Sequence, residues 1–514
     1  MIYTETIRVD GNRPRITSVS VADFNFFVDS TEAIYRIGNR VTGGSMKVRQ
    51  PETAARHSQA VRTLLVLVLI LCCGAQLGMA QSSKGATQTR LVVRDSLGLS
   101  GILNLCALLG CSQMESLGDP QGQLFMIQTP ASLAGLTSLL NLSILGLVTI
   151  ETDQTVRTQG ASAGTAPSYL NDRTLITYYG TSVWHGYVYQ TGNRLIRSNT
   201  THSTYNTAGS GVTVADIDTG VDPNHPILKG SLAAGYDFTR NQSGGSEMGD
   251  VSQSTVAVLD GGTTAQVSQS TVAVLDQSTV AVLDGPQYAA FGHGTMTAGI
   301  IHLVAPQAKI MPLKSFKADG TGYNSDILRA IYYATSHGAK VINMSFNYTS
   351  YSQELANAVN YATSRGVICV AAAGNSGEQA TVYPAALKNV IDVASTSNSD
   401  IQSTFSNYGA PPVWLSAPGE GVMTAYPFGT YAAGWGTSFS APMVSGTAAL
   451  MVAAYSNSGG LLGSLLGTIS QASFEGQVAK ALSHAHPLPD PDMGHGRLDT
   501  YLAVQAWRSS LGLK

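Results

Sequence analysis

From about residue 176 onward, short apolar runs alternate with longer segments whose apolar residues recur at helical spacing. This alternation predicts a parallel sheet covered by helices on both faces, and so a three-layer α/β/α domain over residues 176–508. The clearest strands are predicted at 212–217, 309–313, 340–346 and 367–373, and the clearest helices at 325–337 and 353–365.

A second pattern precedes this domain, within residues 81–157. Its elements follow the order β-α-β-β-α-β, which is typical of a small ferredoxin-like α+β module. We expect strands at 89–94, 123–127 and 148–152, helices at 97–109 and 131–145, and a hairpin turn at 119–122. Residues 158–175 are small and polar, and they are predicted to be a linker.

A continuous apolar run covers residues 64–73, after several basic residues and before Gly78-Met79-Ala80. A basic region, a short apolar core and small residues before a cut are typical of a secretory signal peptide, here residues 46–80. We therefore expect translation to begin at Met46, with residues 1–45 as a mis-called extension. The alternative is an uncleaved membrane anchor at 64–80.

The octapeptide QSTVAVLD occurs at 253–260, 269–276 and 277–284. Repetition in an otherwise unrepetitive chain indicates a duplication in a surface loop, an insertion at 251–284, because loops tolerate added residues cheaply. A calcium or partner site on Asp260, Asp276 and Asp284 is the less favoured interpretation, since one carboxylate per repeat is a sparse ligand set.

The composition of the chain mainly excludes classes of function and kinds of site. Charged residues make up 12% of the chain and the net charge is −3, so nothing indicates binding to nucleic acid or to an anionic membrane. Of the five cysteines, Cys72 and Cys73 fall in the targeting segment, and Cys369 lies in an apolar run where a thiol is typically buried. No Cys/His cluster has zinc spacing, and no disulfide framework is expected.

Four glycine-flanked polar residues stand at the ends of predicted elements. Asp218 follows a strand, His293 opens a helix, Asn375 follows a strand, and Ser438 opens a helix. Each alone has an ordinary structural explanation, such as a turn former or a helix N-cap. Together, the order Asp…His…Ser is that of one known type of catalytic triad.

Residues 205–505 resemble the subtilisin-like (subtilase, S8) serine proteases, and the match is specific. It rests on residues 214–222 (VADIDTGVD), 292–295 (GHGT), 372–375 (AAGN) and 436–442 (GTSFSAP). The resemblance implies a seven-stranded parallel sheet and an inhibitory prodomain, which residues 81–157 would supply. It also implies that Ser438 is the nucleophile, His293 the general base and Asp218 its orienting acid. Asn375 and the Ser438 N–H would form the oxyanion hole, with no metal and no cofactor.

The same resemblance implies that substrate binds as an added strand along two segments, Gly320-Thr321-Gly322 and Ser345-Phe346-Asn347. Many relatives carry glycine where this chain has Asn347, which argues against the usual preference for large apolar side chains. Met296 replaces a second histidine at a packing position. The calcium-binding loop that often follows the His-bearing helix is missing, so no calcium site is predicted.

We therefore predict a secreted serine endopeptidase that is made as a self-processing zymogen and works through an acyl-enzyme. Its partners would be protein or peptide substrates and its own prodomain, with no nucleic acid, and the enzyme would be a monomer. The alternatives are a catalytically silent subtilisin-fold adhesion or binding protein and an enzyme that cuts only itself.

Overall fold

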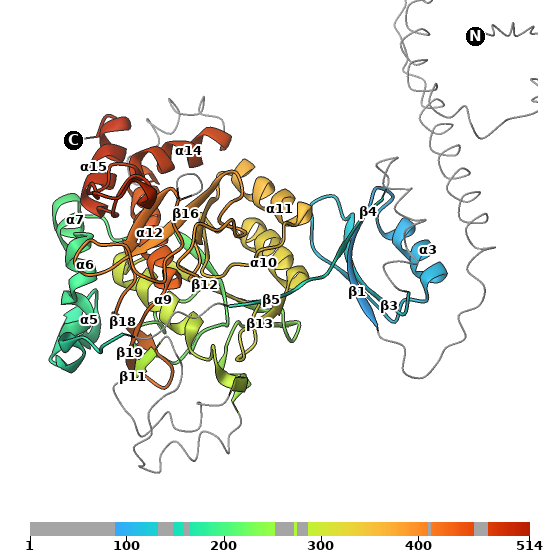
Figure 1. Ribbon diagram of the computed structural model, residues 1–514, viewed down its shortest axis with the longest axis horizontal. Helices are drawn as coiled ribbons and strands as arrows, with labels where there is room; N and C mark the ends of the chain where they lie inside the picture. The colour runs from blue at the N-terminus through green and yellow to red at the C-terminus, as the bar shows by residue number, and fades with distance from the viewer. Residues whose placement is uncertain are drawn as a thin grey trace, which may run out of the picture. The chain divides into compact units, whose positions relative to one another are not determined.

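The computed structural model describes residues 88–131, 148–158, 164–251, 272–274, 286–409, 413–456 and 471–513. Its largest sheet, which includes the strands labelled β12 and β16 in Figure 1, has eight strands in the order β10-β9-β12-β8-β14-β15-β16-β17. The strands from β9 to β17 run parallel, and only β10 is antiparallel to its neighbour, so the predicted seven-stranded parallel sheet is confirmed. The strands are β8 (Thr213–Asp218), β9 (Tyr236–Asp237), β10 (Gln242–Ser243), β12 (Lys309–Lys314), β14 (Val341–Met344), β15 (Ile368–Ala372), β16 (Val390–Thr396) and β17 (Leu415–Pro418).

Helices cover both faces of this sheet, as predicted. One apolar core contains the buried residues of α9 (His293–Val304) and α12 (Thr437–Ser456), and the other contains those of α10 (Asn324–Ser336) and α11 (Gln353–Ser364). The helix α12 is long and apolar enough to cross a membrane, but its apolar window is 100% buried, and it is the central core helix. Two further helices near the C-terminus are α14 (Gln471–Leu482) and α15 (Thr500–Ser510).

The N-terminal module, residues 88–157, forms a four-stranded antiparallel sheet in the order β2-β3-β1-β4. This is the strand order of a ferredoxin-like module. The predicted second helix, 131–145, falls almost wholly outside the described residues. The described elements are β1 (Thr89–Asp95), α3 (Leu99–Leu109), β2 (Gln113–Ser116), β3 (Leu124–Thr129) and β4 (Val148–Thr152).

One expectation for the cysteines is wrong. Cys106 and Cys111 form a disulfide, with their Cα atoms 4.9 Å apart. The reason is local: α3 ends at Gly110, whose left-handed conformation (φ 65°) turns the chain back toward the last helical turn. Cys369 is buried, as expected, and burial raises the pKa of its thiol.

The predicted linker, 158–175, is shorter than expected. Residues Ser168–Asn171 form the short helix η3, in which Leu170 is buried in the core and the Tyr169 hydroxyl donates to Gly421 O at 2.6 Å. The catalytic body therefore begins before residue 176. Beyond η3 come β6 (Leu175–Tyr178), β7 (Thr181–Trp184), α5 (His185–Tyr189), α6 (Thr191–Leu195) and α7 (Ser198–Tyr205).

Little of the repeat insertion is described. Val272–Val274, inside the second copy of the repeat, forms β11, which pairs antiparallel with β19 (Thr430–Gly434). The strand β19 also pairs with β18 (Val422–Tyr426). The chain runs from β19 directly into the segment that carries Ser438. The predicted extension and signal peptide, 1–80, and the rest of the repeats lie outside the described residues.

Candidate active site

Asp218 is the last residue of β8, at the carboxyl edge of the parallel sheet. Its side chain is 2% exposed, and its Oδ1 accepts the N–H of Thr219 at 2.7 Å. Two residues earlier, Asp216 is fully buried and accepts hydrogen bonds from Thr297 and Asn343. Burial first, and then the charge of Asp218, raise the pKa of Asp216 to about 7.

His293 is the first residue of α9, after Gly292, whose φ of 89° lies in the region that favours glycine. The imidazole Nδ1 lies 2.8 Å from Asp218 Oδ1 and 2.9 Å from Oδ2. The two motifs touch at Gly294, where a Cβ would stand 2.1 Å from Gly220 O. Only glycine fits there, so the Asp218 and His293 loops pack backbone to backbone.

The pKa of His293 reflects opposing effects. Burial acts to lower it, whereas the carboxylates of Asp218, Asp216 and Glu247 raise it, and the net result is a rise above the usual value. An Asp218 carboxylate on Nδ1 favours the tautomer that leaves Nε2 free to accept a proton. This arrangement suits a general base.

Ser438 lies in the first turn of α12, two residues after Gly436. It is 5% exposed, and its hydroxyl donates to Ser345 O at 3.1 Å, while Ser345 Oγ donates to Ser438 O at 2.9 Å. The ring of the next residue, Phe439, lies 5.6 Å from the His293 ring, centroid to centroid. The hydroxyl therefore lies at a helix N-terminus, where backbone N–H groups and the helix dipole favour a developing negative charge, and the residue that follows it contacts the imidazole.

Asn375 lies three residues beyond the end of β15 and reaches the segment that precedes Ser438. Its Oδ1 accepts from Thr437 N at 2.9 Å and from Thr437 Oγ1 at 2.8 Å. Because its oxygen is held in this way, the side-chain N–H₂ is oriented as a donor, and a Cβ on Gly436 would stand 3.3 Å from that nitrogen. This geometry suits an oxyanion hole, which needs a preorganised donor next to the nucleophile.

The first predicted substrate segment binds a strand of the chain itself. β13 (Thr321–Tyr323) pairs antiparallel with β5 (Thr155–Arg157), which places Val156 opposite Gly322. The Thr158 N–H extends the pairing by donating to Gly320 O at 2.9 Å. At Gly320 a Cβ would stand 2.4 Å from Thr158 Oγ1. A larger residue than glycine at this position would therefore clash with the chain that follows β5.

The second predicted segment has mixed roles. Ser345 holds Ser438, as described, whereas Phe346 is 1% exposed and packs on Phe316 with ring centroids 4.9 Å apart, so its side chain belongs to the core. Asn347 is 3% exposed, and its Oδ1 has no hydrogen-bond partner in the described structure. Met296 is fully buried, in line with a packing role. In the described ranges no three His, Cys, Asp or Glu side chains converge on a possible metal position.

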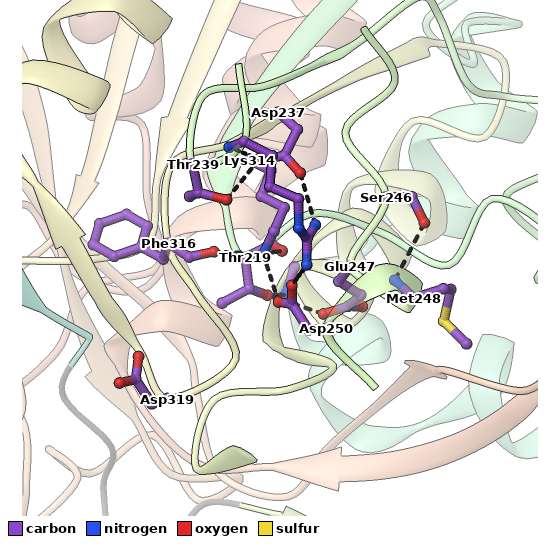
Figure 2. Close-up of polar contacts among 12 residues, drawn as sticks. Thr219, Asp237, Thr239, Ser246, Glu247, Met248, Asp250, Lys314, Phe316 and Asp319 are labelled. Atoms are coloured by element: carbon purple, nitrogen blue, oxygen red, sulfur yellow. Dashed lines mark hydrogen bonds and ion pairs between the residues drawn. The ribbon is translucent and has the colours of Figure 1, made fainter. Parts of the chain in front are cut away.

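Sequence reasoning missed a buried polar cluster behind the Asp218 and His293 motifs. It contains Glu247, Asp250 and Lys314 (Figure 2). Arg240 binds Asp237 and Asp250 at the edge of this cluster. Lys314 could have been suspected, because a lysine at the end of a buried strand needs partners. No sequence pattern singled out Glu247 as a functional residue, because it stands in a glycine-rich segment next to the repeats.

This fold and this arrangement are those of a serine peptidase of the subtilisin type, and the comparisons agree. The family model described as "Subtilase family" matches residues 209–473, and the chain belongs to this family. It is a serine-type endopeptidase.

Thermitase of Thermoactinomyces vulgaris is 33% identical over 307 residues, which cover 58% of this chain and 90% of thermitase. Subtilisin BL of Lederbergia lenta is 37% identical over 169 residues, 31% of this chain and 62% of the relative. A solved lanthipeptide protease covers 60% of this chain and 93% of its own at 26% identity, with a TM-score of 0.46.

Proposed function

We propose that this endopeptidase works through Asp218, His293 and Ser438, with Asn375 and the Ser438 N–H as its oxyanion hole. The observation that carries the proposal is the Asp218–His293 pair, 2.8 Å apart, at the N-terminus of α9 and next to the segment of Ser438. Its order along the chain is that of the subtilisin triad.

The reaction is acyl transfer to water in two steps. Ser438 Oγ attacks the scissile carbonyl as His293 Nε2 takes its proton, and the same proton then passes to the leaving amine. Water, deprotonated by His293, next attacks the acyl-enzyme and releases Ser438. For the first step the hydroxyl has to turn from Ser345 O toward the imidazole, a change of one rotatable bond.

The N-terminal module acts, in this proposal, as an inhibitor that is held until it is cut away. Its carboxylates bind two helix N-termini: Glu151 accepts from the N–H groups of Gln353 and Glu354 at 2.8 and 3.1 Å, and Asp153 accepts from Ser325 N at 2.9 Å. Arg94 also binds Glu354, with its Nη2 2.7 Å from Oε2. These contacts and the β5–β13 pairing support inhibition by occupation of the substrate strand position.

The predicted self-cleavage lies between Thr158 and Gly164. Thr158 is held at Gly320, and a Cβ on Gly164 would stand 2.6 Å from the Trp435 indole nitrogen, three residues before Ser438. Thr158 thus lies at the proposed substrate strand, and Gly164 lies at a residue close in sequence to the proposed nucleophile, which supports a cut between them. This window is narrower than the range 156–211 that the sequence alone allows.

Secretion is part of the same proposal. The apolar segment at 64–73 and the Cys106–Cys111 disulfide support it, because structural disulfides form in oxidising compartments. Mass spectrometry of the exported protein tests it. A mature chain without residues 46–80 is expected, whereas any peptide from 1–45 would overturn the proposed start at Met46.

A fluorophosphonate probe tests the proposed chemistry against a silent binding protein, because only an activated serine reacts. Digestion of casein then separates a general endopeptidase from an enzyme that cuts only itself. We expect labelling and digestion by the processed protein, and neither by Ser438→Ala.

A further inference from the structure

Glu247 is fully buried, and it contacts the loops of both proposed catalytic partners. Its Oε2 accepts the Gly292 N–H at 2.8 Å and the Thr219 hydroxyl at 3.1 Å, and its Oε1 accepts the Thr295 hydroxyl. Gly292 precedes His293, and Thr219 follows Asp218. One side chain thus bridges the two motifs.

The direction of these hydrogen bonds is determined. The Thr219 oxygen accepts the Gly294 N–H at 2.9 Å, and the Thr295 oxygen accepts the Asp222 N–H at 2.7 Å. A hydroxyl has one proton to give, and the structure directs both of these protons to Glu247. The peptide N–H groups on both sides of His293 are therefore connected to this carboxyl. The Gly292 N–H binds it directly, and the Gly294 N–H binds the Thr219 hydroxyl, which in turn donates to it.

From this geometry we infer that Glu247 is a positioning residue for His293. The inference rests on the proposed triad and adds a fourth side chain that touches neither substrate nor the reacting atoms. It fixes the start of α9, and with it the orientation of the imidazole toward Asp218 and Ser438.

Burial raises the pKa of Glu247 to about 8, although the hydrogen bonds from Thr295 and Gly292 and the charge of Lys314 act against that rise. The carboxyl is therefore mostly protonated at neutral pH and becomes ionised above about pH 8. The Lys314 Nζ is itself fully buried and donates to Thr219 O at 2.7 Å, to Phe316 O at 2.6 Å and to Asp250 Oδ2 at 2.8 Å (Figure 2).

Two further ion pairs complete the cluster. Arg240 binds Asp250 through Nη2, and its Nη1 lies 2.8 Å from Asp237 Oδ2. Arg240 and Lys314 thereby neutralise Asp237 and Asp250. The carboxyl of Glu247 is left to the three donors, and an N-terminal helix end favours a negative charge at that place.

A consequence follows for His293. Without the carboxyl, the Gly292 N–H and both threonine hydroxyls lose their acceptor, and the imidazole shifts; misplacement of a catalytic group by about 1 Å costs up to about 100-fold in rate. Because the pKa of Glu247 is raised to about 8, the group carries little charge on the acid limb of kcat/KM, so its loss should act through the position of His293 and not through charge.

The test is Glu247→Gln in the processed enzyme, with a peptide substrate and a pH series. We expect kcat to fall between about 10- and 100-fold, KM to stay within about twofold, and the acid limb to stay where it is in the wild type. Glu247→Asp keeps a carboxyl acceptor and should restore part of the lost kcat. The matched control is Glu475→Gln on α14, a buried glutamate in another part of the fold, whose kcat and limb should equal those of the wild type.

A kcat per active site that matches the wild type in Glu247→Gln overturns the inference, because general destabilisation lowers only the fraction of active molecules. Titration of active sites with a fluorophosphonate corrects for that fraction. Ser438→Ala in the same assay separates the two proposals. If Ser438→Ala still turns over substrate, the triad is wrong; if it is dead and Glu247→Gln is normal, only the role of Glu247 is wrong.

Discussion

The N-termini of α9, α10 and α11 each bind a carboxylate, but the carboxylates come from different parts of the chain. At α9 the acceptor is Glu247, which belongs to the catalytic body and is fully buried. At α10 and α11 the acceptors are Asp153 and Glu151, which belong to the N-terminal module. The physics is the same in each case, since free N–H groups and the helix dipole attract an anion.

The difference lies in permanence. In the proposed zymogen, the contact at α9 stays with the mature enzyme and serves the proposed base, whereas the contacts at α10 and α11 are lost when the cut module dissociates. A single type of interaction can therefore hold a catalytic group for the life of the protein or hold an inhibitor for a limited time.

The largest expected effect is that of the nucleophile. Ser438→Ala should lower turnover by about 10⁶-fold, the size of loss seen when the serine of a triad protease is removed. The variant should keep the module uncleaved and melt no earlier than the wild type, because the change removes one oxygen. Made in a protease-deficient host and followed by intact mass, a variant processed to the wild-type N-terminus would show that another protease does the cutting.

Asp218→Asn should cost about 10⁴-fold in kcat, because an amide at this position favours the wrong imidazole tautomer. The measurement is kcat on a peptide substrate with the fold checked by circular dichroism. A loss below tenfold would remove Asp218 from the proposed mechanism.

The module contacts should matter for inhibition and not for turnover. Glu151→Gln and Asp153→Asn each remove a charged acceptor, and a hydrogen bond to a charged group is worth about 1.5–3 kcal/mol, which weakens retention of the cut module by at least about 10-fold. The measurement is the amount of the fragment ending near Thr158 that co-elutes with processed enzyme. Glu115→Gln is the control: it loses only the partly exposed contact with Arg329 and should release the module little faster than wild type.

Retention of the module should also depend on pH. Burial raises the pKa of Asp326, at the start of α10, to about 7, and the charge of Asp153 adds to this rise. The charges of Arg329 and Arg90 act to lower the same pKa. A carboxyl whose pKa is higher in the complex than after release binds a proton on association. The module should therefore be held more tightly at pH 6 than at pH 8. Equal co-elution at both values would exclude Asp326 as a contributor, and Asp326→Asn should abolish the difference.

The smallest effect is expected from the repeats. Deletion of 269–276 removes β11, but the adjoining copy at 277–284 has the same sequence and can supply the same strand to β19. Activity should stay within about twofold of wild type, since a loop can change length at little cost. A large loss with an unchanged melting temperature would give the second copy a role at the active site.

The sheet, its helices and the proposed triad could be predicted because their signals are local. Strands such as β15 are continuous apolar runs, and each proposed catalytic residue stands in a glycine-flanked motif at the end of an element. The ferredoxin-like strand order followed from the same kind of pattern.

What the pattern did not predict depends on contacts between distant segments. Glu247 meets Thr295 across 48 positions in a region without periodicity, and Val156 faces Gly322 because β5 pairs with β13, a strand far from it in the sequence. The Cys106–Cys111 pair depends on how Gly110 turns the chain, which spacing alone does not reveal.

Mapping a fluorophosphonate adduct on the processed enzyme tests whether His293 and Asp218 activate Ser438. We expect one adduct, on Ser438 in the peptide GTSFSAP. We also expect loss of labelling in His293→Ala, which keeps the hydroxyl but removes the base. An adduct on another serine, or undiminished labelling of His293→Ala, would contradict the proposed activation of Ser438.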